Sequence, residues 1–123
     1  MRAIAIHAYG GQERLQFMDL PIPEIGPDDV LIRVRAAGVN PADISFREGR
    51  YAQRVPLSFP AIMGSDFAGT VAQVGKQVRA VREDAQVYGT AWGGGSYAEY
   101  LRVPAAGEFA ALPASLDVVL VLT

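Results

Sequence analysis

The sequence has no cysteine and only one histidine, His7, among its 123 residues. A disulfide framework and a thiolate metal site are therefore impossible, and a metal-binding histidine cluster is excluded as well. We expect His7 to be a structural or solvent-exposed residue rather than a catalyst, because a lone histidine at the end of a strand pattern rarely acts alone. The lack of cysteine fits a cytoplasmic protein.

An excess of one charge sign and long apolar runs are also missing. Eleven basic and thirteen acidic residues are spread along the chain and give a net charge of -2. No basic tract is present that would neutralise phosphates, so we predict no nucleic-acid partner and no membrane-surface partner. No run of about 18 apolar residues could span a bilayer, and the apolar start is too short for a signal peptide. We therefore predict a cytoplasmic location.

Phosphate-binding glycine motifs are absent too. Residues 64–70, GSDFAGT, have two spaced glycines but no lysine, and the residues that follow alternate as a strand. The glycines at 93–95 precede a strand pattern, whereas a dinucleotide fingerprint opens a helix. The chain thus carries no self-contained nucleotide-binding unit. Asp66 is either a buried carboxylate or a turn and strand-entry residue.

What the chain does contain indicates one globular domain over residues 1–123. Half of the residues are hydrophobic and a fifth are charged, which is typical of a folded soluble chain. Alternation of apolar and polar residues predicts strands, most clearly at 30–35, where Val30, Ile32 and Val34 share one face. Glycine and proline separate these segments, and their spacing predicts a mainly β barrel or sandwich. The predicted strands are 2–7, 14–19, 30–35, 70–74, 85–88 and 97–103.

The stretch AAGVNPAD at 36–43 predicts the start of a helix. Asn40 is a favoured N-cap residue, Pro41 occupies the first helical position, and Asp43 lies in the first turn at the positive end of the helix dipole. Gly49 is expected to end the helix about two turns later. Whether Asn40 is only a cap or also part of a chemical site is left open by the pattern.

The aromatic residues are assigned to the core by default. Tyr51 is the exception, because it follows a glycine and an arginine in a polar segment and either packs inside or presents its hydroxyl to a cleft. The other aromatic residues that we weigh here are Phe46, Phe59, Phe67, Trp92 and Tyr97.

The order of motifs along almost the whole chain resembles the N-terminal, GroES-like domain of the medium-chain dehydrogenase/reductase superfamily, in its zinc-independent quinone oxidoreductase (zeta-crystallin-like) branch. Each motif alone is weak, and their joint order carries the resemblance. The motifs are MRAIAIH at 1–7, PIPE at 21–24, VLIRV at 30–34, AAGVNPAD at 36–43, REGRY at 47–51, GSDFAG at 64–69 and GGSYAEY at 94–100.

The resemblance implies a distorted, partly open β-barrel with a few short helices. In family members a Rossmann domain that binds NADPH follows it, and the substrate lies in the cleft between the two domains. It also implies that zinc is absent, because zinc alcohol dehydrogenases place a cysteine at the position of Asn40 and a histidine at that of Ser65. Neither residue present here is a good zinc ligand. Hydride transfer to a quinone or activated enone must then rely on positioning and hydrogen bonds.

By resemblance, Asn40 and Tyr51 are the candidate catalytic residues. Asn40 and Pro41 lie at the nicotinamide end of the cleft, and Tyr51, Ser45 and Trp92 are the candidate substrate contacts. Ser45 replaces a second cleft tyrosine of some relatives, which changes the expected hydrogen bonding. Asp43 matches a recurrent family position, and we weight it as structural because the helix dipole already accounts for it.

Relatives continue from residues 112–116 into a helix and a glycine-rich nucleotide fold, whereas this chain ends with the apolar residues 118–122 and Thr123. We therefore expect a truncated, isolated chain that is inactive without a Rossmann domain or a complementing chain, and no tight NADPH binding. The alternative is a non-catalytic binding domain that uses the apolar C-terminus to form homo-oligomers. The particular quinone or enone is not specified by the sequence.

Overall fold

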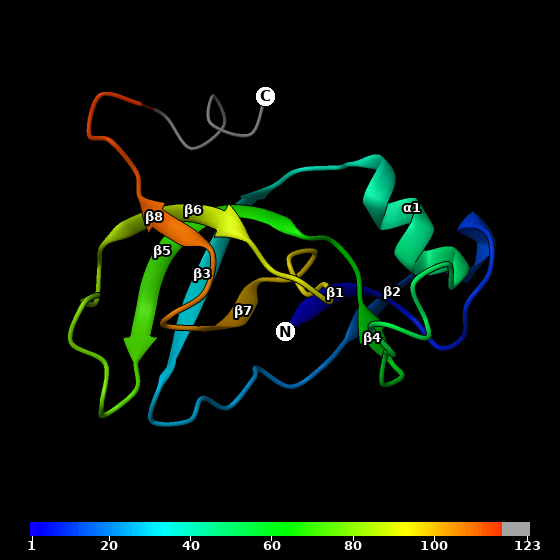
Figure 1. The fold of residues 1–123 in the computed structure, drawn as a ribbon, viewed down its shortest axis with the longest axis horizontal. Coiled ribbons are helices and arrows are strands. Elements are labelled where there is room, and N and C mark those ends of the chain that lie inside the picture. Colours follow the sequence, from blue (N-terminus) through cyan, green and yellow to red (C-terminus); the bar gives the residue numbers. More distant parts are fainter. Residues whose placement is uncertain (117–123) are drawn as a thin grey trace.

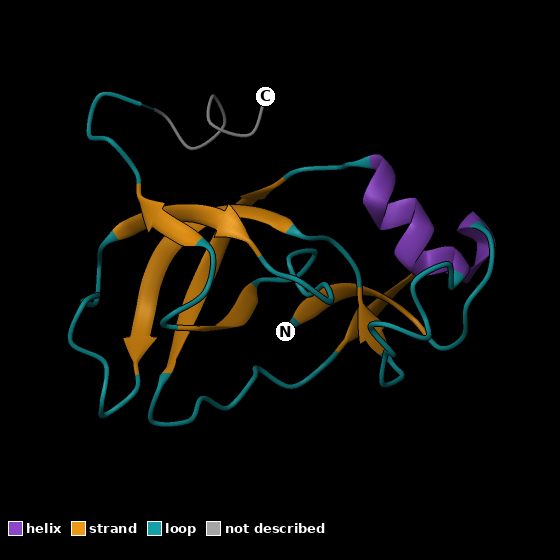
Figure 2. Ribbon diagram, in the orientation of Figure 1, coloured by secondary structure: helices purple, strands orange, loops and turns teal. Residues whose placement is uncertain are grey.

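The computed structural model describes residues 1–116, which form two antiparallel sheets (Figures 1 and 2). The smaller sheet has the strand order β2-β1-β4 and the larger one β7-β3-β5-β6-β8. The mainly β, partly open GroES-like architecture is thereby confirmed. The strands are β1 (Arg2–Ile6), β2 (Gln16–Asp19), β3 (Asp29–Ala37), β4 (Ala61–Ile62), β5 (Asp66–Val74), β6 (Gln86–Thr90), β7 (Tyr100–Pro104) and β8 (Phe109–Ala111).

All six predicted strands are present with shifted ends. The largest shift is in β5, which begins at Asp66 instead of residue 70 because its first half pairs with both β3 and β6. β7 begins at Tyr100 instead of residue 97. Strands β4 and β8 were not predicted, since two or three residues are too short to show an alternating period.

The main core lies on one face of the five-stranded sheet. The alternating residues of β3 explain this, because Val30 and Ile32 are fully buried while Arg33 and Arg35 are exposed. Phe67 is also fully buried on the neighbouring strand β5. Burial of such side chains stabilises the fold by roughly 1.5–3 kcal/mol each. The buried cluster consists of Val30, Ile32, Phe67, Val71, Val78, Val87, Ala91, Leu101 and Val103.

Two of the default core assignments are wrong. Trp92 is 71% exposed and Phe59 is 41% exposed, because both lie in loops outside the sheets. Phe46 and Phe67 are buried as predicted. The two buried residues thus lie in a helix and a strand, whereas the two exposed residues lie in loops.

Helix α1 (Pro41–Glu48) begins and ends where the sequence predicts. The Asp43 carboxylate accepts a hydrogen bond from the Asn40 backbone N–H, with Asp43 Oδ2 2.8 Å from the nitrogen. Pro41 is the first helical residue, and Gly49 follows the last one with a left-handed φ of 85°. A short 3-10 helix, η1 (Gln12–Arg14), precedes β2.

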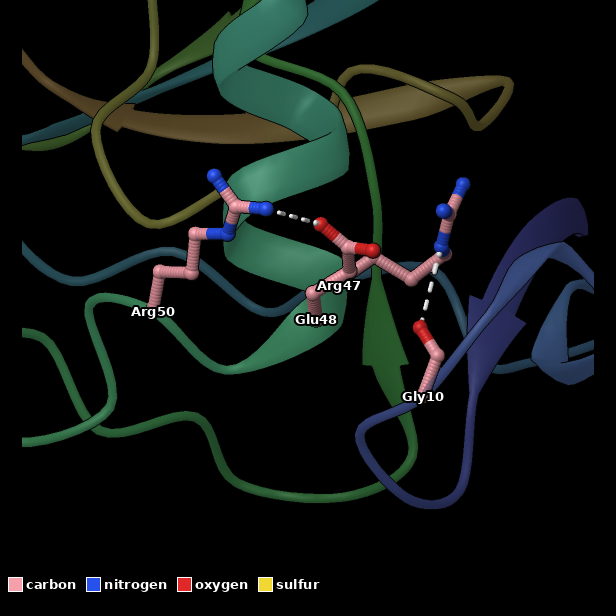
Figure 3. Close-up of polar contacts among 4 residues, drawn as sticks. All are labelled: Gly10, Arg47, Glu48 and Arg50. Atoms are coloured by element: carbon pink, nitrogen blue, oxygen red, sulfur yellow. Dashed lines mark hydrogen bonds and ion pairs between the residues drawn. The ribbon is translucent and has the colours of Figure 1, made fainter.

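The C-terminal end of α1 is tied to the loop between β1 and η1. Arg47 donates from Nε to the Gly10 carbonyl oxygen over 3.2 Å (Figure 3). The Gly10 N–H donates to the Arg47 carbonyl oxygen over 3.0 Å. Arg50 and Glu48 form an exposed ion pair beside it, which contributes little to stability. The helix therefore stands beside the three-stranded sheet, as Figure 1 shows.

Residues 96–99, which we call the bridging segment, join the two sheets. Tyr97 accepts a backbone hydrogen bond from Ile4 of β1 over 2.8 Å, and Glu99 donates to Arg2 of the same strand over 3.2 Å. Glu99 also accepts from Val34 of β3 over 2.9 Å. One short segment thus bonds to both sheets at their junction. The apolar residues 118–122, on which the oligomerisation alternative depends, lie outside the described residues.

Candidate active site

The candidate site is built where β3 ends, β5 begins and α1 begins. Gly38, just after β3, donates from its backbone N–H to the Asp66 carbonyl oxygen over 3.1 Å. This bond brings the first residue of β5 beside the loop that leads into α1. Asn40, which precedes the helix, donates from Nδ2 to Asp66 Oδ2 over 2.7 Å. The sequence left two roles open for Asp66, and the structure shows a partly buried strand-entry carboxylate that holds Asn40.

A second chain of hydrogen bonds reaches the same loop from the bridging segment. The Tyr97 hydroxyl lies 3.0 Å from Asp43 Oδ2 and 3.2 Å from the Gly38 carbonyl oxygen, so it has two acceptors within reach. Asp43 is 8% exposed and accepts from both Tyr97 and the Asn40 backbone. This agrees with the structural role that the helix dipole suggested for Asp43.

Tyr97 is neutral at ordinary pH. Burial raises the pKa of its hydroxyl, and the hydrogen bond to Asp43 and the negative charges of Asp43 and Asp66 raise it further. The hydroxyl therefore keeps its proton and acts as a donor to Asp43. We had treated Tyr97 only as a core residue, and nothing in the local pattern pointed to its hydrogen-bonding role.

A glycine at position 64 permits this arrangement. Gly64 has a left-handed φ of 89°, and a Cβ atom there would overlap the Tyr97 ring and the Ser96 hydroxyl. The glycine lies in the GSDFAG motif, directly before Ser65 and Asp66. Its φ and its lack of a side chain let the chain turn into β5 while the tyrosine packs against it.

The structure places Asn40 and Tyr51 at opposite ends of α1. The helix has eight residues, so its two ends are about 12 Å apart at 1.5 Å per residue. Tyr51 is 38% exposed, and its ring packs against Phe46 with centroids 4.9 Å apart. Tyr51 is therefore partly packed and partly exposed, and the placing of its hydroxyl in a cleft stays a prediction. Its hydroxyl is not brought into contact with Asn40.

The remaining predicted site residues surround this helix and the start of β5. Pro41 is exposed at the first helical position, and Ser45 is partly buried in the middle of α1. Trp92 follows Ala91, whose N–H donates to the Ser65 carbonyl oxygen over 2.8 Å. That bond places the exposed indole in a loop next to the strand that carries Asp66. The roles of these residues stay predictions.

The donor groups at this site do not suit zinc. Asn40 and Ser65 offer a neutral amide and a hydroxyl, and the Asn40 amide nitrogen is already bonded to Asp66. Within residues 1–116, no three or more histidine, cysteine, aspartate or glutamate side chains are grouped so that they could hold a metal ion. None of the helices in that part of the chain is long and apolar enough to cross a membrane.

Two antiparallel sheets that form no closed barrel, with one capped helix beside the smaller sheet, are consistent with the GroES-like class of domains. The family described as "Alcohol dehydrogenase GroES-like domain" matches residues 26–114, which is most of the chain. The chain belongs to this family, within the medium-chain dehydrogenase/reductase superfamily, as the motif order predicted.

Several proteins that are similar to this chain are named as oxidoreductases. The quinone oxidoreductase of Lama guanicoe is 41% identical over 103 residues, which are 81% of this chain and 30% of the relative. The chloroplastic NADPH-dependent alkenal/one oxidoreductase of Arabidopsis thaliana is 40% identical over 90 residues, or 72% and 23% of the two chains. The structure of Escherichia coli quinone oxidoreductase complexed with NADPH superposes with a TM-score of 0.86 at 27% identity, over 96% of this chain and 35% of that one.

The chain thus spans about a third or less of the length of these relatives.

Proposed function

We propose that this chain is the substrate-side domain of an NADPH-dependent quinone oxidoreductase that reduces quinones or other activated enones by hydride transfer without zinc. The observation that carries the proposal is the Asn40 amide, held by Asp66. By the resemblance, Asn40 stands where zinc alcohol dehydrogenases have a cysteine ligand. The names of the relatives support the same class, since they include a quinone oxidoreductase and an alkenal/one oxidoreductase.

In this reaction the domain would position the substrate and donate hydrogen bonds to it. NADPH, when bound, supplies the hydride. An acceptor carbonyl gains negative charge as it is reduced, and fixed hydrogen-bond donors stabilise that charge. Asn40 has a second amide hydrogen besides the one directed at Asp66, and it lies directly before α1. We assign Asn40 and Pro41 to the nicotinamide end of the cleft.

The substrate contacts in this proposal are Tyr51, Ser45 and Trp92. The exposed Trp92 indole offers a flat apolar surface of the kind on which a quinone ring stacks. Tyr51 follows the C-terminal end of α1, whereas Asn40 precedes its N-terminal end, so we assign Tyr51 to the outer wall of the cleft and not to the reacting carbonyl. The particular quinone or enone is set by these residues together with the parts of the cleft outside this chain.

We also propose that the 123 residues alone do not catalyse the reaction. The sequence has no glycine-rich phosphate loop that opens a helix, so the pyrophosphate and adenosine of NADPH have no evident site here. A cofactor domain, on the same or another chain, is the required partner. The cytoplasmic location and the formation of homo-oligomers stay predictions from the sequence.

The test has two arms. NADPH titrated into the isolated chain, followed by calorimetry, is expected to show no binding tighter than about the millimolar range, which is roughly -4 kcal/mol. A chimera that joins this chain to the cofactor domain of the Escherichia coli quinone oxidoreductase is expected to oxidise NADPH when a quinone is added. Sub-micromolar NADPH binding by the isolated chain would contradict the first expectation.

A folded chimera that binds NADPH but turns over neither quinones nor alkenals would contradict the proposed function. Asn40→Ala in the active chimera is expected to lower kcat/KM by about tenfold or more, the cost of losing one hydrogen bond to developing charge. Ser115→Ala, an exposed change beyond the sheets, is the control and should leave turnover unchanged. Unaltered kinetics in Asn40→Ala would reduce this residue to a helix cap.

A further inference from the structure

We infer that Asp66 is a positioning residue that holds the Asn40 amide in one orientation at the candidate site. This inference rests on the proposed function only in assigning Asn40 to the ligand. The contact itself is a 2.7 Å hydrogen bond from Asn40 Nδ2 to Asp66 Oδ2. That distance is at the short end for an N–H donor, as expected when the acceptor is an ionised carboxylate.

The backbone brings the two side chains together. Asp66 begins β5 and pairs with Thr90 of β6, so its position is fixed from one side by the sheet. On the other side its carbonyl oxygen accepts from Gly38, two residues before Asn40. Both residues of the pair are thus anchored on regular elements, and the hydrogen bond between their side chains closes a short loop.

The chemistry of the pair selects one orientation of the amide. A free asparagine amide presents its nitrogen and its oxygen with similar ease, because the two ends have nearly the same shape. An ionised carboxylate only accepts hydrogen bonds, so it admits the nitrogen and rejects the oxygen. Asp66 therefore decides which end of Asn40 points toward β5 and which polar atoms remain for a ligand.

The two carboxylates of the site have different tasks. Asp43 accepts from the Asn40 backbone and from the Tyr97 hydroxyl, and both bonds hold the start of α1 in place. Among residues 1–116, the side chain of Asp66 has the Asn40 amide as its one hydrogen-bond partner. Loss of the Asp66 carboxylate should therefore remove the acceptor of the Asn40 amide nitrogen while it leaves the helix intact.

The hydrogen bonding of the Asn40 side chain can be measured directly, because Asn40 is the only asparagine in the chain. Its side-chain NH₂ group gives a unique pair of signals in an NMR spectrum of protein labelled with ¹⁵N-asparagine. The glutamine side chains serve as internal references after uniform labelling, because all of them are exposed. They are Gln12, Gln16, Gln53, Gln73, Gln77 and Gln86.

In the 123-residue chain we expect the Asn40 side-chain amide to exchange with water at least about tenfold more slowly than the glutamine amides, because it donates to a carboxylate. Asp66→Asn should abolish that protection, and Asp66→Glu should retain part of it. Asp29→Asn is the matched control. It also removes a carboxylate that accepts one hydrogen bond, from the Gly26 N–H, but at the start of β3.

Exchange of the Asn40 amide at the rate of the glutamines in the unmodified chain would overturn the inference. So would protection that survives in Asp66→Asn. If Asp66→Asn fails to fold, the unmodified chain and Asp66→Glu still give a decisive result. Asp29→Asn should leave the Asn40 signals unchanged.

A double-mutant cycle in the chimera tests whether Asp66 acts through Asn40. Asp66→Asn should lower kcat with little change in KM, and it should add less than about a twofold effect when Asn40 is already alanine. Losses that multiply in the double variant would contradict the positioning role. A chimera without turnover would contradict the proposed function instead, while amide exchange would still decide whether Asp66 holds Asn40.

Discussion

Replacing Tyr97 by phenylalanine removes one oxygen atom from the centre of the hydrogen-bond network. The hydroxyl lies 3.0 Å from Asp43 Oδ2, and Asp43 is only 8% exposed. After the change the carboxylate retains the Asn40 backbone N–H as a donor, but it loses its second donor. The ring itself is kept, so packing against Gly64 is unaffected.

The expected cost can be worked from this geometry. A hydrogen bond to a charged group contributes about 1.5–3 kcal/mol to stability. Tyr97 is partly exposed, so water replaces some of the lost interaction and the low end, about 1.5 kcal/mol, applies. In a domain of this size that corresponds to a fall in Tm of about 6 °C.

Urea unfolding followed by far-UV circular dichroism measures the change. Tryptophan fluorescence is a poor probe here, since the single tryptophan, Trp92, is 71% exposed in the folded chain. Tyr100→Phe is the matched control. It deletes the same atom from a partly buried tyrosine of β7 and should change the free energy of unfolding by less than about 0.5 kcal/mol.

The same substitution has a signature in the pH dependence. The pKa of Tyr97 is raised in the folded state, chiefly by burial, so above about pH 10 the unfolded chain loses this proton while the folded chain keeps it. Stability should fall as the pH rises above 10, by at most about 1.4 kcal/mol per pH unit and less where solvent screens the group.

Below pH 10 Tyr97 is protonated in both the folded and the unfolded state, so it does not make the free energy of unfolding depend on pH. Tyr97→Phe should flatten the alkaline decline, whereas Tyr100→Phe should keep it. Equal stability of Tyr97→Phe and the parent at pH 7, together with parallel curves above pH 10, would refute the reasoning.

Two further predictions concern packing and use the same unfolding assay. Gly64→Ala should destabilise the domain more than Gly93→Ala, because both glycines have a φ near 90° and share a strain of about 1–3 kcal/mol, but only a Cβ at 64 meets the Tyr97 ring. Equal costs would show that the ring moves aside freely. Phe67→Ala should cost about 3–5 kcal/mol at a fully buried site, whereas Phe17→Ala, at a residue 70% exposed, should cost under about 1 kcal/mol. A small loss in Phe67→Ala would contradict the assigned core.

Much of the fold could be predicted because its signals are local. The signals for β3 and α1 lie within or directly beside these elements. They are the alternation in β3 and the residues Asn40, Pro41 and Gly49 at the ends of α1. Strands β4 and β8 carry no such signal, since their existence depends on the partners β1 and β6. The true start of β5 was missed for the same reason.

The candidate site was predicted only in part. Asn40 was singled out because its chemistry differs from that of a zinc ligand, and the structure adds the partner that holds it. Tyr97 and Asp66 meet that loop across 59 and 26 residues of sequence, from Gly38 and Asn40 respectively. No local pattern encodes such pairings, because they follow from the way the two sheets meet. Exposure of Trp92 was likewise decided by its loop and not by its residue type.

The bridging segment has a consequence for how variants of this domain should be interpreted. Tyr97 is bonded through its backbone to the smaller sheet and through its hydroxyl to the loop that carries the candidate site. The order of the site therefore depends on how the two sheets dock as well as on the hydrogen bonds within the site itself. A distant substitution that weakens the contact between the sheets would therefore lower turnover as a substitution in the site does. The turnover of a variant should be interpreted together with its free energy of unfolding.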